Sequence, residues 1–572
     1  MEQRFLLVFL LMAVIIFGAQ FFMKKYVPQP PPGSAHPSQP AQPTPGQAPV
    51  SLESAAVAPS KPSRPAQSTS TKEAAAESET VIENDLYKIT FTNRGAQAKS
   101  WVLKKYFDDQ GRPLDLVNAA ASAKYGYPLS LWTYDETLRN RLSSALYVAS
   151  ESGAVTAPAK VEFDYSDSGL IVRKTLQFDD TYVVHVETSV FLNDSPVYAF
   201  PSWPAGFGDQ TDLAAYAAGQ IEYQFNGDTE HLPAKKISSG NTIHGTYNWL
   251  GASSSYFGAI FIPDDIEKLT AVTLHNAIEI APDASKPNET KPVDVLGVAV
   301  GHPGQSSARL FAGPKAVEVL GSIPVPTIIG ADKDLRNVVN FGWFGAIARP
   351  LFAYRFIGLR WFHEYTHNWG WAIVIQTFFI TLLLLPLRIY QMRSALKMQK
   401  VQPHMKAIQE KYKKYSMRDP RKQEMQKEIG ELYKAHGVNP VGGCLPLVFQ
   451  MPFFIGYYKM LSAAIELRHA HWLWIHDLSS SDFILPLIMA GSMFLVQKMT
   501  PQAGMDPAQQ KMMTVMLPVM MGFFFFRLPA GLNLYYAESN LISIAQQWIM
   551  NRTELGREMR AIAAKRARKR DK

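Results

Sequence analysis

Residues 363–367 spell His-Glu-Tyr-Thr-His, a pattern whose residue types and spacing suit a zinc protease. On a helix, this pattern places His363 and His367 on one face, with Glu364 beside them as a general base. Gly370 also fits the longer form of the motif, but Ile373 stands where a third metal ligand is required. The sequence therefore predicts no metal site here, and a zinc metalloprotease is kept only as a remote alternative.

A second set of polar residues lies inside apolar segments towards the carboxyl end. At about 100° per residue, five of them fall within roughly 80° on one face of a helix: Asn533, Tyr536, Asn540, Ser543 and Gln547. Three others share a face of an earlier segment within roughly 40°: Thr377, Thr381 and Arg388. Such faces could line one wet cavity, because polar groups are costly in lipid, or they could bond helix to helix. Glu538 lies nearly opposite the first face, and the sequence names no partner for it.

These residues belong to five apolar segments with almost no internal charge: residues 369–387, 443–464, 483–496, 512–526 and 529–550. A bilayer core about 30 Å thick needs about 20 apolar residues in a helix. The third and fourth segments are several residues short, and the other three are long enough. We therefore predict a five-helix transmembrane core over residues 368–550. Aromatic residues beside Arg and His at 346–367 predict an amphipathic helix in the membrane interface.

The first part of the chain predicts an anchor, a linker and a β domain. Residues 5–23 form an apolar run without a good cleavage site, so we expect residues 1–25 to be an uncleaved anchor. Residues 26–82 are rich in Pro, Ala, Ser and Gln, which predicts a disordered linker. Residues 83–345, with strand patterns at 86–93 and 170–192, predict a large, mainly antiparallel β-sandwich. Because the only cysteine, Cys444, lies in an apolar segment, we expect no disulfide in that domain.

The distribution of basic residues predicts the topology. Lys and Arg are dense in residues 389–440, which read as a hairpin of two amphipathic helices at 390–415 and 419–436, and again in the tail at 551–572. By the positive-inside rule both stretches are cytoplasmic, which with six spans puts both termini in the cytoplasm and the β domain outside. The hairpin is either a solvated face or a docking surface for ribosomal RNA, nascent chains or anionic lipid. The basic stretches lack a nucleic-acid motif, so sequence-specific binding is not expected.

Longer stretches of sequence resemble one known family. They are NPVGGCLPLVFQMPFFIGYYKML at 439–461, LPAGLNLYYAESNLISIAQQ at 528–547, NWGWAIVIQTF at 368–378 and NWLGASSSYFGAIFIP in the β domain. The chain is similar in these stretches to the YidC family of bacterial membrane protein insertases, in the form with a large periplasmic domain. The resemblance implies an inner-membrane protein that moves hydrophobic segments of nascent membrane proteins into the bilayer, alone or with the Sec translocon. It implies no enzyme activity and no cofactor or metal, with the ribosome and the lipid bilayer as further partners.

The resemblance also assigns roles within a hydrophilic groove that is open to the cytoplasm and to lipid. Thr377 matches the family's substrate-contacting Thr, and Tyr535 and Tyr536 match its Tyr pair. Thr381 stands where the family has a groove Arg. Arg388 lies on the same face, roughly 10 Å nearer the cytoplasm, and we hypothesise that it partly replaces the missing charge.

Two alternatives to this interpretation stay open. The groove could be neutral, with Thr381, Asn533 and water sufficient for its function. The protein could also be a passive assembly scaffold, which binds partners without transferring a client into lipid.

Overall fold

The computed structural model describes residues 71–558, apart from 226, 268, 282–285, 287, 327–332, 343–344, 354–357, 416–418, 439–444, 500–506 and 555, together with residue 561. The expected anchor at 1–25 and most of the expected linker at 26–82 lie outside the described residues. So does the basic tail, except for its first few residues.

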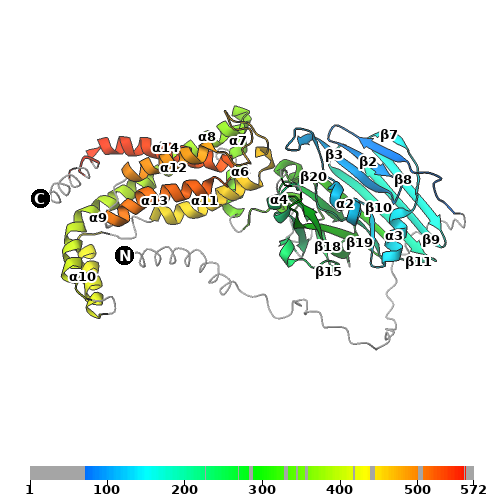
Figure 1. Ribbon diagram of the computed structural model, residues 1–572, viewed down its shortest axis with the longest axis horizontal. Helices are drawn as coiled ribbons and strands as arrows, with labels where there is room; N and C mark the ends of the chain where they lie inside the picture. The colour runs from blue at the N-terminus through cyan, green and yellow to red at the C-terminus, as the bar shows by residue number, and fades with distance from the viewer. Residues whose placement is uncertain are drawn as a thin grey trace. The chain divides into compact units, whose positions relative to one another are not determined.

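The β domain is built from three sheets, the largest of which has ten strands (Figure 1). That sheet runs in the order β14 (Asp228–Pro233), β13 (Gln220–Phe225), β16 (Tyr247–Ser253), β17 (Phe257–Pro263), β20 (Gln305–Pro314), β10 (Val183–Leu192), β9 (Leu170–Phe178), β8 (Ala159–Asp167) and β6 (Val148–Ala149), with β11 (Ser195–Pro196) paired to β10. The predicted strand region at 170–192 is the antiparallel hairpin β9–β10, in which Leu176 pairs with Val186. Alternate residues of β10 are buried, because successive side chains of a strand point to opposite faces.

Two five-stranded sheets complete the β domain. One is β4 (Pro113–Asp115), β3 (Gln97–Phe107), β2 (Tyr87–Thr92), β1 (Glu79–Glu83) and β7 (Gly153–Thr156); the other is β15 (Asn241–Gly245), β18 (Leu269–Ile280), β19 (Lys291–Gly301), β12 (Ala199–Trp203) and β5 (Leu131–Thr133). Among the described pairings only β1 and β7 run parallel, so the predicted mainly antiparallel β-rich domain is confirmed. Its first strand, β1, begins before residue 83, where we had expected the linker to end.

Short helices cross between the strands: α2 (Ala119–Tyr125), α3 (Glu136–Ser144), α4 (Leu213–Ala217) and α5 (Val317–Gly321). Asn118 and Asp135 begin the first two, since their side-chain oxygens accept from the backbone N–H groups of Ala121 and Leu138.

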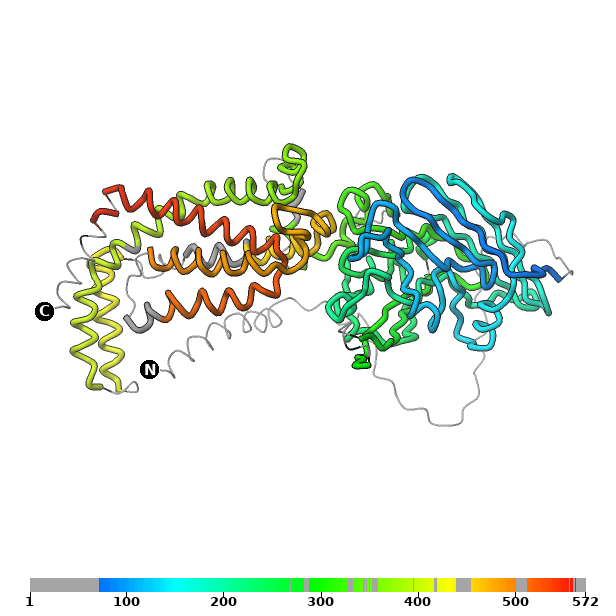
Figure 2. The backbone as a smooth tube through the Cα atoms, turned by 45° about the horizontal axis from the view of Figure 1, so that its top comes forward, coloured from blue at the N-terminus to red at the C-terminus, as the bar shows by residue number. Residues whose placement is uncertain are grey.

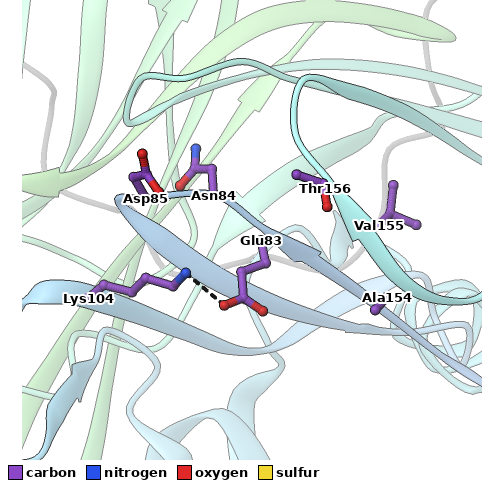
Figure 3. Close-up of a pocket in the computed structure, with 7 residues that line it drawn as sticks. All are labelled: Glu83, Asn84, Asp85, Lys104, Ala154, Val155 and Thr156. Atoms are coloured by element: carbon purple, nitrogen blue, oxygen red, sulfur yellow. Dashed lines mark ion pairs between the residues drawn. The ribbon is translucent and has the colours of Figure 1, made fainter.

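A pocket of ≈ 210 Å³ lies at the edge of the sheet that contains β1 (Figure 3). It is lined by Glu83, Asn84, Asp85, Lys104, Ala154, Val155 and Thr156. Lys104 Nζ lies 2.7 Å from Glu83 Oε1. Because these two charges already pair with each other, the pocket gives no specific indication of a ligand.

The carboxyl-terminal half is helical, as predicted. Its elements are α6 (Gly345–Ala353), α7 (Leu359–Thr366), α8 (Trp369–Leu383), α9 (Leu385–Lys411), α10 (Arg421–Ala435), α11 (Leu445–Ala463), α12 (Ile484–Met499), α13 (Pro507–Phe525) and α14 (Ala530–Arg552). Helices α8 and α11–α14 correspond to the five predicted apolar segments, and they run alongside one another (Figures 1 and 2). We call this group, with the start of α9, the helical core.

Within the described residues no helix taken singly has both the length and the hydropathy that a membrane crossing requires. Helices α8 and α9 together reach both, across a bend of 48°. The bend falls at Leu384, and Pro386 stands in the first turn of α9, where its missing N–H costs no helical hydrogen bond.

The predicted hairpin is present in the structure, whereas the predicted interfacial helix is divided in two. The predicted hairpin is present as α9 and α10, and Lys411 Nζ of one helix lies 2.7 Å from Glu428 Oε1 of the other. Its first helix, however, starts at Leu385 and so includes Arg388. The single interfacial helix expected at 346–367 is instead two helices, α6 and α7, with residues 354–357 between them outside the described residues.

Candidate functional site

The helical core buries polar side chains among its apolar ones and exposes large apolar side chains on its outside. Among the described residues of these helices, seven polar side chains are buried: Gln376, Thr377, Thr381, Ser492, Asn533, Ser543 and Gln547. Large apolar residues are exposed on the outer faces, among them Leu383 at 74% and Phe523 at 72%. This arrangement suits helices surrounded by hydrocarbon, because in water the apolar faces would be turned inwards.

The polar face of α8 is bonded mainly within its own helix. The Thr377 hydroxyl donates to Ile373 O at 2.7 Å, and the Thr381 hydroxyl donates to Thr377 O at 2.6 Å. Each hydroxyl has one proton, so both oxygens keep acceptor lone pairs for other partners.

Gln376, which sequence reasoning did not single out, links α8 to two neighbouring helices. Its Nε2 donates to Leu351 O of α6 at 2.8 Å, and its Oε1 accepts from the Tyr457 hydroxyl of α11 at 3.0 Å. The signal for it was present in the sequence, because an amide inside an apolar segment needs a partner.

Asn533 and Asn540 on α14 join that helix to its neighbours. Asn533 Nδ2 donates to Phe525 O at 3.1 Å and to Leu528 O at 3.3 Å, at the end of α13. Asn540 Nδ2 donates to Ser492 Oγ of α12 at 3.2 Å. These contacts fit the helix-to-helix interpretation of the predicted polar face, while a role in client contact stays a prediction.

Arg388 joins the start of α9 to α14. Its Nη2 donates to Ser543 Oγ at 2.5 Å and its Nη1 donates to Gln546 Oε1 at 2.9 Å. The structure therefore brings two predicted site residues, Arg388 and Ser543, into direct contact. Gln547 donates to Asn551 Oδ1 of its own helix at 3.0 Å.

The two predicted tyrosines pack against other aromatic rings. Tyr535 stacks on Tyr457 of α11 with ring centroids 4.2 Å apart. Tyr536 meets Phe454 of α11 at 4.9 Å and Phe525 of α13 at 5.0 Å, both edge to face. Tyr536 is half-buried, so part of its ring is accessible.

Glu538 has neighbours that the sequence could not name. Its carboxyl group lies close to the Thr377 side chain of α8, and Tyr457 of α11 is near it. The second carboxyl oxygen, Oε2, is buried without a hydrogen-bond partner. Thr377 thus faces Glu538, on the side of α14 nearly opposite the predicted polar face.

The zinc-like motif does not lie on one helical face. Helix α7 ends at Thr366, and His367 follows it with a left-handed φ of 51°. His363 stacks on Trp369, with ring centroids 3.9 Å apart. Across the described part of the chain, His, Cys, Asp and Glu side chains form no group of three suited to a metal ion.

Comparisons with known proteins match both halves of the chain. The family model "YidC periplasmic domain" matches residues 79–354, and the family model "60Kd inner membrane protein" matches residues 361–557. A membrane protein insertase YidC from Geotalea uraniireducens is 34% identical over 83% of this chain and 87% of its own length. One from Syntrophus aciditrophicus is 32% identical over 96% of this chain and 100% of its own length.

A crystal structure of an active YidC insertase covers 84% of this chain and 94% of its own, at 20% identity and a TM-score of 0.33. A periplasmic β domain followed by a helical membrane region defines the class of protein. The chain belongs to the YidC family of membrane protein insertases.

Proposed function

We propose that this protein moves hydrophobic segments of nascent proteins sideways into the inner membrane through a hydrophilic groove in its helical core. One observation carries the proposal: polar side chains are buried between the helices while apolar ones are exposed outside. The polar outer portion of a client segment enters the groove, where hydrogen-bonding groups lower the cost of leaving water. Burial of the client's apolar side chains then drives the segment into lipid.

The short helices of the core reduce the barrier further. Helix α12 has 16 residues, so it spans roughly 24 Å against a hydrocarbon thickness of about 30 Å. A short span thins the bilayer around it, which shortens the path that a client's polar portion must cross.

The proposal includes a topology and partners. The α9–α10 hairpin and both termini lie in the cytoplasm and the β domain lies in the periplasm, as the basic residues indicate. The hairpin and the basic tail contact the ribosome through their charge, and the Sec translocon supplies some of the clients. The protein acts without a cofactor, and it is not an enzyme.

Site-specific crosslinking during translation tests the groove. A photoreactive residue at Thr377 or Tyr536 should form adducts with ribosome-bound nascent membrane proteins, whereas one at the exposed Tyr134 of the β domain should not. Thr377 is fully buried, so α8 and α14 must move apart to admit a client there. Clients that insert without forming adducts at either position would contradict the groove.

A reconstituted system separates insertion from the scaffold alternative. Full-length protein in liposomes should make a client resistant to extraction by alkaline carbonate and protect its translocated tail from protease. A passive scaffold would bind the client without either change. The remote protease alternative predicts cleavage of the client that His363→Ala abolishes.

A further inference from the structure

Glu538 is a carboxyl group inside the helical core that lacks a cation. It lies on α14, and among the described residues no Lys, Arg or His nitrogen is within 4.0 Å of it, since none of the ion pairs found includes it. Arg388, whose guanidinium contacts α14, is bound to Ser543 and Gln546. Those two residues lie roughly 7 to 12 Å further along the helix axis.

The known neighbours of Glu538 do not supply it with a donor. The hydroxyl proton of Thr377 is already donated to Ile373 O of its own helix, which leaves its oxygen lone pairs beside Glu538. Glu538 Oε2 is buried without a hydrogen-bond donor. A buried acceptor without a donor is unfavourable, so this part of the core is suited to a visiting donor.

Charge complementarity selects the kind of donor. A carboxyl group gains most from a cationic donor, because charge-assisted hydrogen bonds are stronger than neutral ones, especially in surroundings of low polarity. An acidic client side chain would instead find another carboxyl group and the Thr377 lone pairs, with no cation to pair with.

We propose that Glu538 is a specificity-determining residue of the groove, which favours clients that carry Lys or Arg in the portion to be translocated. The inference rests on the proposed function, since it assigns a charge preference to that same groove. The client's cation binds at Glu538 Oε2 while the segment passes between α8 and α14, and Thr377 supplies a further acceptor.

The test uses full-length protein in liposomes and one client made in three versions, with Lys, Gln or Asp at a single position of the translocated tail. Wild-type protein should insert the Lys client better than the Asp client by roughly fivefold or more, as expected for a close charge pair. Glu538→Gln should bring this ratio close to one, and Glu538→Lys should invert it. Glu538→Asp keeps the charge and should retain most of the preference.

Glu151→Gln removes an exposed carboxyl group of the β domain and serves as the matched control, which should keep the wild-type ratio. Equal insertion of the Lys and Asp clients by wild-type protein would overturn the inference and leave the proposed function intact. A Glu538→Gln variant that loses all three clients in the same proportion would show a packing role instead, which also overturns it. If no client inserts above the level of empty liposomes, the proposed function fails and the inference fails with it.

Discussion

The surface of the β domain suits water, whereas the surface of the helical core suits hydrocarbon. Trp101 and Trp249 in the β domain are fully buried, whereas Leu383 and Phe523 in the helical core are mostly exposed. Both regions bury polar side chains as well, but for different reasons. The β domain packs them into a fixed core, whereas under the function proposed above the helical core keeps them where a client can replace their partners.

Lys174 is a buried charged group of the β domain whose hydrogen-bonding capacity is fully used. Its ammonium group donates to Gly95 O at 2.8 Å and to Ala96 O and Leu129 O at 2.9 Å, which uses all three of its protons. Burial lowers the pKa of Lys174 to about 7, while the three carbonyl groups favour the charged form. Carboxyl groups are less completely satisfied in both regions: Asp209 Oδ1 and Glu222 Oε2 in the β domain and Glu538 Oε2 in the helical core are buried without a hydrogen-bond donor.

The largest expected effect tests the fixed core. Lys174→Met should lower the free energy of unfolding of the β domain by about 3 kcal/mol, because three buried carbonyl groups lose their donor. Hydrogen exchange of the β9 and β10 amides in the full chain measures the change. Lys160→Met removes an exposed lysine of the neighbouring strand β8 and should leave the stability nearly unchanged. If the two substitutions lowered the stability equally, the three buried hydrogen bonds of Lys174 would not be what stabilises the domain.

The next prediction concerns the displaced arginine of the helical core. Arg388→Ala should impair growth of an insertase-depleted strain, because its two charge-assisted hydrogen bonds to α14 are lost. Arg393→Ala, an exposed position on the same helix, is the control and should complement normally. If Arg388→Ala inserts clients normally while Thr381→Val does not, the groove works as a neutral one and the displaced-arginine hypothesis fails.

A pH effect of intermediate size is expected in the β domain. Burial raises the pKa of Asp209 to about 6, although Ser254 donates a hydrogen bond to it at 2.7 Å. The folded state then binds more protons than the unfolded state between about pH 4 and pH 6, so stability falls as pH rises through this window. Asp209→Asn should abolish that fall and stabilise the domain at pH 8 by about 1–2 kcal/mol, measured by hydrogen exchange in β12 and β16. An unchanged pH profile in the variant would assign the dependence to other groups.

The smallest effect is expected where charges meet in water. The Lys411–Glu428 pair joins α9 to α10, and both side chains are exposed. Glu428→Gln should lower helical-hairpin stability only slightly, and less at high salt, because exposed ion pairs are weak. Proteolysis of the hairpin in the full chain is a suitable measure. A loss comparable to that of Lys174→Met would show that this surface is not simply solvated.

Sequence periodicity predicted the element types well because apolar runs and alternating patterns are local. The hairpin β9–β10 and the five apolar segments lie close to their predicted places. The contacts within the candidate site were harder to predict. Helical angles grouped the Asn533 face correctly as one side of α14, but they cannot say which neighbouring helix packs against that side.

Glu538 illustrates this limit. It lies beside Thr377 because α8 packs against that side of α14, and this packing cannot be read from helical angles. The sequence pattern also did not predict that the interfacial segment is divided into α6 and α7. A composition of aromatic and basic residues indicates an interface, but it does not fix where a helix ends.

The bend between α8 and α9 lets α9 act as a lever that connects the hairpin to the helical core. Arg388 lies about 6 Å from the bend at Leu384, while Pro403 on the same helix lies about 28 Å from it. A rotation of α9 about the bend therefore moves its distal part roughly five times as far as it moves Arg388. Conversely, a bound partner that displaces the far end of the hairpin by several ångströms shifts Arg388 by about 1 Å. A shift of that size is enough to lengthen the Arg388–Ser543 hydrogen bond beyond its normal range.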